Sequence, residues 1–292
     1  MTQMPGKETA RGDHPARAAA PPLIRIAPAG GMPHLDLHEL FHYRELLYFL
    51  AWRDVKVHYK QAALGVAWAV LQPLLTMIVF SIVFGRLAGL PSEGIPYPVF
   101  TFAALLPWQF FAGALTRAGT SLVSNTNLIT KVYFPRLVIP CAAVLSGLVD
   151  FAVSFAVLLG LMAWYGMPLT PAILLLPLLL LLLVLAALAA SLWLSALHVR
   201  YRDVQYTIPF LVQAWFFISP VAYSRKLVPA GTWEFIYGLN PLAGIIQGFR
   251  WALVGAAPPE GLVTTAVLTT LVLLAGGLYY FKRMEDSFAD VI

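Results

Sequence analysis

Asp150 is the one acidic residue deep within a long apolar run of this sequence. An ionisable group at such a depth in a membrane is costly, so its carboxylate should face protein or a cavity and have a partner. One functional role would be a step in a proton relay. We favour a structural role, an interhelical bond to Ser146, Ser154 or a residue on another span, because no second acid, His or Lys continues a relay.

Catalytic and metal-binding motifs are missing from the sequence. An intramembrane enzyme acting on a lipid-linked substrate would need paired catalytic groups, but there is no HExxH, no GxSxG and no second acid near Asp150. A proton-coupled secondary transporter would need several intramembrane charges and an inverted repeat, and neither is visible. These two classes, a membrane enzyme and a secondary transporter, are kept as alternatives. Cys141 is the only cysteine, so we expect no disulfide, metal or redox site.

The composition indicates an integral membrane protein. Of the 292 residues, 60% are hydrophobic and 11% are charged, against roughly 25% charged residues in soluble domains. Apolar segments lie at about 63–85, 98–121, 141–165, 172–197, 207–223 and 261–281. We therefore predict an all-α integral membrane domain with six transmembrane helices over residues 62–285. A disordered cytoplasmic tail at 1–34 precedes it, and a short cytoplasmic tail at 286–292 follows it.

The distribution of Lys and Arg predicts the orientation. With the N-terminus inside and the tail at 1–34 left out, four of them lie outside, namely Arg86, Arg225, Lys226 and Arg250. Eleven flank the spans on the cytoplasmic side: Arg44, Arg53, Lys56, Lys60, Arg117, Lys131, Arg136, Arg200, Arg202, Lys282 and Arg283. Because an excess of Lys and Arg marks the cytoplasmic side, both termini are expected there. This sorting accounts for the net charge of +5, so the charge is no indication of nucleic acid binding.

Residues 35–61 are predicted to form an amphipathic helix. Asp36 and Glu39 resemble a capping box, and apolar residues then recur at spacings of three and four up to Tyr59. The opposite face is basic and the edge carries Trp and Tyr, which is typical of a helix lying in the membrane interface. A soluble helix packed on a partner subunit is the alternative.

Residues 122–140 interrupt two long apolar runs and are predicted to form a cytoplasmic coupling loop. Asn125 or Thr126 can cap a short helix, which Pro135 would end. Its apolar stripe is Leu128, Ile129, Val132 and Tyr133, and its cations are Lys131 and Arg136. Such a helix could dock into a separate ATPase. An ordinary connector on the membrane surface is the alternative.

Residues 224–260 are too apolar for an ordinary external loop and too broken for a span. The runs Thr232–Leu239 and Pro241–Val254 have helical character, with Asn240 as the cap of the second. We predict a re-entrant hairpin that dips into the outer leaflet and borders a translocation path, with Trp233, Asn240, Pro241 and Arg250 as gate residues. Two helices lying flat on the outer surface are the alternative.

Four blocks of the sequence resemble one family. They are YKQAALGVAWAVLQPLL from Tyr59, NLITKVYFPRLVIP at 127–140, YRDVQYTIPFLVQAWFFISPVAY at 201–223 and LNPLAGIIQGFR at 239–250. They are similar to the permeases of type-2 ABC polysaccharide exporters of the Wzm-like group, which export O-antigen, teichoic acid or capsule. The similarity covers roughly residues 40–285, and the four blocks occur in the family's order.

The resemblance implies a homodimer in the bacterial inner membrane, paired with two copies of an ATPase subunit. It also implies export of a polysaccharide linked to undecaprenyl diphosphate, with O-antigen as the first candidate, and contact with membrane lipid but not with nucleic acid. This chain contains no GxxxxGK[ST] loop, so the ATPase partner is expected to bind ATP and Mg²⁺, and no cofactor is expected here.

For such a substrate, two sets of residues and Asp150 gain possible roles. Aromatic rings offer a surface on which sugars can slide, although such clusters also form lipid-facing belts. The candidate channel residues are Trp108, Phe111, Trp215, Phe216, Phe217 and Tyr223. Consecutive residues are about 100° apart on a helix, so at least one of 215–217 must face lipid or another helix. Asp150 could hydrogen-bond the glycan instead of serving a relay.

The lipid head group needs fixed positive charge where it enters at the inner interface. Arg53, Lys56 and Lys60 lie within two turns of the amphipathic helix and could bind its diphosphate. Simple attraction to anionic lipid would explain the same three residues, so both roles stay open.

Overall fold

The computed structural model describes residues 41–60, 66–227, 231–285 and 287–288, without the side chains of Val66 and Lys226. In this part of the chain all regular structure is helical and there is no strand, as predicted. The predicted tail at 1–34 and the capping box of Asp36 and Glu39 lie outside the described residues.

The helices follow one another as α2 (Arg44–Lys60), α3 (Val66–Phe80), α4 (Tyr97–Ser124), α5 (Thr126–Lys131), α6 (Val138–Trp164), α7 (Leu176–Arg200), α8 (Val204–Ile218), α9 (Thr232–Leu239), α10 (Pro241–Val254) and α11 (Leu262–Glu285). A π-helical segment, η1 (Ser81–Leu87), continues α3. Two 3₁₀ segments, η2 (Pro171–Leu175) and η3 (Arg225–Leu227), precede α7 and α9 respectively.

Five helical segments of the described residues are long and apolar enough to cross a membrane. They are Ala67–Leu87, Tyr97–Ser124, Val138–Trp164, Pro171–Arg200 and Leu262–Glu285. The sixth predicted span, at 207–223, corresponds to α8, which has 15 residues. At 1.5 Å per residue α8 is about 22 Å long, shorter than the roughly 30 Å hydrocarbon core. The multi-pass helical architecture is confirmed, and the sixth span stays a prediction.

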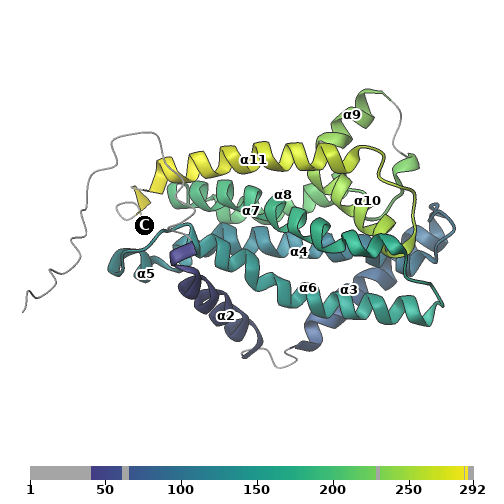
Figure 1. The fold of residues 1–292 in the computed structure, drawn as a ribbon, viewed down its shortest axis with the longest axis horizontal. Coiled ribbons are helices and arrows are strands. Elements are labelled where there is room, and N and C mark those ends of the chain that lie inside the picture. Colours follow the sequence, from purple (N-terminus) through teal and green to yellow (C-terminus); the bar gives the residue numbers. More distant parts are fainter. Residues whose placement is uncertain (1–40, 61–65, 228–230, 286, 289–292) are drawn as a thin grey trace, which may run out of the picture. The chain divides into compact units, whose positions relative to one another are not determined.

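Helix α4 lies at the centre of the bundle and positions most of the residues discussed below. It packs against α3, α6, α7, α8 and α10. Its most apolar window is 78% buried, whereas that of Ala67–Leu87 is only 11% buried. The long helices α4, α6, α7 and α11 run side by side, with α5 at one end of them and α9 and α10 at the other (Figure 1).

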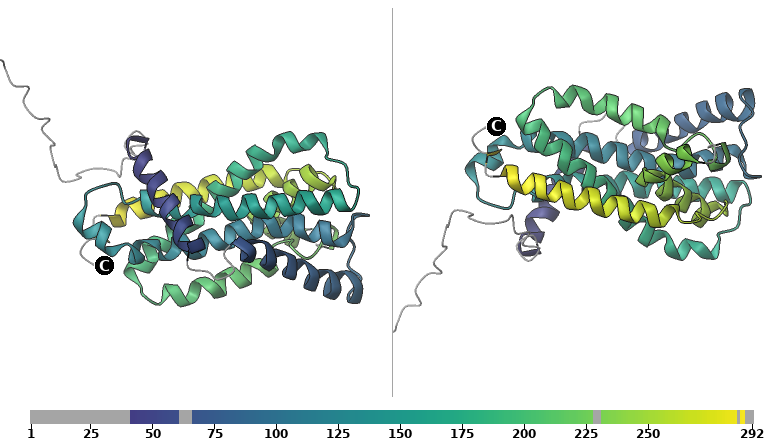
Figure 2. Two further views of the ribbon diagram at one scale, coloured as in Figure 1. Left: turned by 90° about the horizontal axis from the view of Figure 1, so that it is seen from below. Right: turned by 90° about the horizontal axis from the view of Figure 1, so that it is seen from above.

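Helix α2 crosses the long helices at an angle and packs against α6 (Figure 2, left). Leu50 and Val55 are its buried residues, while Tyr48, Phe49 and Trp52 are exposed. The sequence predicted one apolar face for this helix. In the structure its apolar side chains are divided between a packed face and an exposed aromatic face. Its location in a membrane interface stays a prediction.

Candidate functional site: a polar cavity in the helical bundle

A cavity of about 650 Å³ lies among α3, α4, α6 and α8, close to the end of α2. Its apolar lining includes the aromatic rings of Trp68, Trp108, Phe110, Phe151 and Phe216 together with smaller and aliphatic residues such as Leu105 and Leu106. Groups able to hydrogen-bond also line it, namely His58, Gln72, Thr76, Gln109, Thr116, Arg117, Asp150 and Ser154. Flat rings beside amide, hydroxyl and charged groups form a lining suited to a ligand with both apolar and hydroxyl faces.

Asp150 projects from α6 into this cavity and has two partners. Its Oδ2 lies 3.6 Å from Nη1 of Arg117 on α4. Its Oδ1 accepts a hydrogen bond from the phenol of Tyr59 at the end of α2. The expectation of a partner on another span is confirmed, because α4 supplies Arg117.

The hydroxyl partners proposed from the sequence are wrong. Ser146 Oγ donates to the carbonyl of Ala143 at 2.9 Å, and Ser154 Oγ donates to the carbonyl of Ala69 at 3.4 Å. A serine within a helix commonly bonds to a carbonyl of its own preceding turn, as Ser146 does, and is then not available to a more distant carboxylate.

Two glycines make room for the guanidinium of Arg117. A Cβ atom at Gly147 of α6 would lie 2.1 Å from Nη2, and one at Gly113 of α4 would lie 2.9 Å from Nη1. Any side chain at Gly147 would therefore displace the guanidinium. Arg117 was not predicted as a site residue because it was counted among the cytoplasmic cations. Its position, seven residues before the end of an apolar helix, could have indicated a role inside the bundle.

Tyr59 acts as a hydrogen-bond donor to Asp150. Burial raises the pKa of the Tyr59 phenol above its usual value near 10, and the hydrogen bond to Asp150 raises it further. The phenol therefore keeps its proton at neutral pH and ties the end of α2 to α6.

The predicted channel aromatics separate into three environments. Trp108 and Phe216 line the cavity and pack against each other, with ring centroids 5.2 Å apart. Phe111 is fully buried and packs against the half-buried Trp215 at 4.9 Å, and neither is among the residues that line the cavity. Phe217 is 65% exposed, which agrees with the expectation that one of the three consecutive rings faces away from the channel.

Comparison with known proteins gives the family. The sequence pattern of the family described as "ABC-2 type transporter" matches residues 45–254. The chain belongs to the ABC-2 type transporter family. The resemblance to ABC exporter permeases seen in the sequence is thereby confirmed, and the chain is a multi-pass membrane protein of that family.

Several relatives align with most of this chain and with nearly all of their own length. The chain is 30% identical over 260 residues to the O-antigen export system permease protein RfbA of Myxococcus xanthus, an alignment covering 88% of this chain and 98% of that relative. It is 28% identical to a protein of the same name from Klebsiella pneumoniae, covering 85% and 95% respectively. It is 24% identical to the polysialic acid transport protein KpsM of Escherichia coli, covering 80% and 92%.

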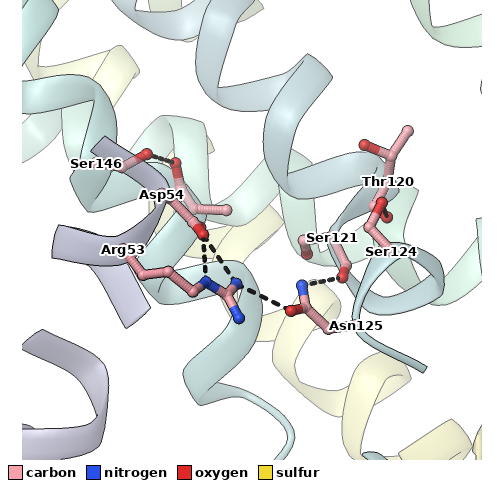
Figure 3. Close-up of polar contacts among 8 residues, drawn as sticks. Arg53, Asp54, Thr120, Ser121, Ser124, Asn125 and Ser146 are labelled. Atoms are coloured by element: carbon pink, nitrogen blue, oxygen red, sulfur yellow. Dashed lines mark hydrogen bonds and ion pairs between the residues drawn. The ribbon is translucent and has the colours of Figure 1, made fainter. Parts of the chain in front are cut away.

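In this ABC-2 family member, the three cations predicted for a lipid head group are not equivalent. Arg53 Nη2 donates to Asp54 Oδ1 at 2.8 Å and to Asn125 Oδ1 at 2.9 Å, so this arginine is already engaged (Figure 3). Lys56 and Lys60 are exposed, and Lys56 Nζ lies 5.6 Å from the ring centroid of Trp52. All three line a surface hollow of about 410 Å³ on α2. Their role in binding a head group stays a prediction.

The predicted coupling helix exists as α5 but is shorter than expected. It covers Thr126–Lys131, and Val132 is already extended, so neither Tyr133 nor Pro135 belongs to it or ends it. Neither predicted cap forms: Asn125 stands at the N-cap position but makes no side-chain cap bond, and the Thr126 hydroxyl donates to the carbonyl of Val123 at 2.6 Å. The Asn125 amide instead donates to the carbonyl of Ser121 at 2.8 Å and accepts from Arg53 (Figure 3).

The apolar residues of the coupling segment have different surroundings. Ile129 is buried in a cluster with Leu50 of α2 and Phe281 of α11, and Leu128 packs against that cluster. Tyr133 is 82% exposed, beside exposed Lys131 and Val132. Pro135 is buried and Arg136 is half-buried, its backbone N donating to Glu285 Oε1 at 3.0 Å. Among the residues predicted to contact the ATPase, Lys131 and Tyr133 are therefore the exposed ones, with exposed Val132 between them.

The helices of the predicted external hairpin have the boundaries predicted from the sequence, Thr232–Leu239 and Pro241–Val254. The Asn240 cap is confirmed, because its side chain accepts from Leu242 N at 3.1 Å. The same side chain accepts from Trp215 Nε1 at 3.0 Å and donates to Ser219 Oγ at 3.0 Å. Asn240 thus joins the break between α9 and α10 to the end of α8.

The other two gate residues lie in opposite environments. Trp233 is 66% exposed. Arg250 is completely buried, and its guanidinium donates to the carbonyls of Phe100 at 3.2 Å, Tyr223 at 3.1 Å and Val221 at 2.8 Å. Arg250 is therefore not a surface charge but links α10 to α4 and to the segment after α8. Its place on the outer side of the membrane stays a prediction.

Proposed function

We propose that this chain is the permease subunit of an ATP-driven exporter that moves polysaccharide linked to undecaprenyl diphosphate out of the cytoplasm across the bacterial inner membrane. O-antigen is the proposed cargo, because the relatives RfbA carry that activity in their names and align over nearly their full length. The observation that carries the proposal is the cavity in the bundle, whose aromatic rings and hydrogen-bonding side chains suit the apolar and hydroxyl faces of sugars.

The exporter would contain two copies of this chain. Supporting this, the segment Ala67–Leu87 beside the cavity is largely unburied within one copy and carries a run of exposed apolar residues. A second copy seated against such a surface could complete the wall of a pathway that one copy only partly encloses.

ATP and Mg²⁺ would be bound by two copies of a separate ATPase subunit. Its contact would be the exposed patch of Lys131, Val132 and Tyr133 at the end of α5. Ile129 anchors α5 in the cluster that also contains residues of α2, α6, α7 and α11. A movement imposed on α5 would therefore be passed to those helices, because a close-packed cluster does not deform at one member alone.

Deletion of the gene for this chain tests the function. The polymer should then accumulate inside the cell, and expression of the chain together with its ATPase should restore surface polymer. The complex, purified from producing cells, should carry a prenyl-diphosphate-linked glycan identifiable by mass spectrometry. Export that persists with a hydrolysis-dead ATPase and stops when the proton gradient is collapsed would instead establish a secondary transporter.

A further inference from the structure

The guanidinium of Arg117 has unused hydrogen-bonding capacity at the edge of the cavity. Its Nε is buried and has no hydrogen-bond partner in the part of the chain that the structure describes. Its one ion pair there is with Asp150, at 3.6 Å, beyond the 2.7–2.9 Å typical of a charge-assisted hydrogen bond. A half-buried guanidinium with loose pairing retains part of its desolvation cost, so a better anionic partner would bind it favourably.

The surroundings hold this cation in a fixed place that remains open to the cavity. Gly113 and Gly147 leave space for the guanidinium, and both it and the Asp150 carboxylate line the cavity. Their side chains remain 31% and 32% exposed, so a ligand in the cavity can reach both. Phosphate oxygens suit the planar fork of Arg, which binds them in pairs.

The depth of Arg117 fits a group that enters from the inner membrane surface. It is seven residues from the end of α4 at Ser124. At 1.5 Å per residue this is about 10 Å from the α5 end of the bundle, less than half of a hydrocarbon core of roughly 30 Å. The cavity's aromatic wall, including Trp108 and Phe216, lies beyond it along α4 and α8.

We propose that Arg117 binds a phosphate group of the lipid carrier, and that Asp150 is the internal anion that this phosphate replaces. The inference rests on the proposed function and names the site that receives its head group. Exchange frees the Asp150 carboxylate from Arg117, and phosphate repels that carboxylate. Because Tyr59 bonds to Asp150, the exchange also acts on the end of α2. Binding of phosphate in the cavity therefore changes the contacts of α2, the helix that packs against α6 and bonds to Asn125 at the α4–α5 junction.

Two variants test the charge. The complete complex with its ATPase, in an uncharged detergent, is titrated with farnesyl diphosphate in a calorimeter. Arg117→Gln should weaken binding at least tenfold, and Asp150→Asn should tighten it severalfold because the competing carboxylate is gone. Arg283→Gln removes one exposed cation from the last turn of α11 and should leave the affinity within about twofold.

A second pair of variants keeps every charge and serves if Arg117→Gln fails to assemble. Gly147→Ala places a methyl group where Nη2 now lies, so it should weaken binding by displacing the guanidinium. Gly160→Ala, in the same helix α6, meets no atom within 4 Å and is the matched control. Equal affinity in Gly147→Ala and Gly160→Ala would overturn the proposal, as would unchanged affinity in Arg117→Gln.

Phosphatidylglycerol as a second probe distinguishes the source of the phosphate. Tighter Arg117-dependent binding of farnesyl diphosphate supports the lipid carrier as the ligand. If wild type binds phosphatidylglycerol through Arg117 but no prenyl diphosphate, the cation site is real but the carrier assignment and the lipid-linked cargo both fail. If wild type binds prenyl diphosphate and Arg117→Gln binds it equally, this inference fails while the proposed cargo stands.

Discussion

Asn240 gives the sharpest test of the predicted external gate, because one side chain fastens the α9–α10 break to α8. Asn240→Ala removes the cap bond to Leu242 N and leaves the indole N–H of half-buried Trp215 without its acceptor. The lost cap costs about 1 kcal/mol and the orphaned donor about 1–3 kcal/mol. The bond to Ser219 adds about 0.5–1.5 kcal/mol. Together these losses destabilise the arrangement seen in the structure by about 4 kcal/mol.

If the hairpin closes the pathway at rest, that loss shifts the balance between closed and open states more than a hundredfold, since 1.4 kcal/mol is a factor of ten. Liposomes holding the complex without ATP should then leak K⁺ faster with Asn240→Ala than with wild type. Asn240→Ser is the matched variant, because serine can still cap α10 but is too short to hold Trp215 as well. It should leak at an intermediate rate.

The refuting result is a tight liposome with Asn240→Ala together with normal polymer export. The hairpin would then be a structural lid rather than a gate. A fall in heat stability without any leak would lead to the same conclusion, because it would show that the three bonds stabilise the fold but do not hold a barrier.

Three further outcomes are expected. Tyr133→Asp should uncouple polymer export from ATP hydrolysis while membrane insertion is unchanged, because the ring is 82% exposed; normal export and assembly would remove Tyr133 from the ATPase contact. Arg250→Met should lower the free energy of unfolding by about 3 kcal/mol, and with it the melting temperature, because three carbonyls lose their donor. An unchanged melting temperature would contradict this. Burial raises the pKa of Tyr59, so its contribution to stability is complete below about pH 10 and declines above it. Melting curves of wild type and Tyr59→Phe between pH 8 and 11 should therefore converge as pH rises.

The external helices were predictable because local sequence signals decide them. Asn240 and Pro241 stop one helix and start the next with groups that lie within three residues, so no distant contact is needed. The prediction for the coupling helix used the same kind of local signal and was wrong. Asn125 had the right type for a cap, but Arg53, distant in sequence, donates to its side-chain oxygen Oδ1, and α5 ends at Lys131 before the chain reaches Tyr133.

Aromatic positions were predictable as a group but not one by one. Periodicity correctly required that Trp215, Phe216 and Phe217 face different directions. Which of them reaches the cavity depends on where α4 lies against α8, and Trp108 decides it by packing on Phe216. A contact between two helices that are a hundred residues apart in the chain leaves no pattern within either segment.

The charged residues show why a rule that sorts cations by membrane side can hide a site. Arg117 was counted as cytoplasmic and Arg250 as external, yet the first faces Asp150 within the bundle and the second is wholly buried. Removing one from each set leaves ten cations against three, so the predicted orientation does not depend on them. A basic residue inside an apolar helix is costly unless other groups compensate its charge, and three backbone carbonyls compensate the charge of Arg250. Arg117 has one loose carboxylate contact and an unpartnered Nε among the described residues, which makes it the cation whose function lies in what enters the cavity.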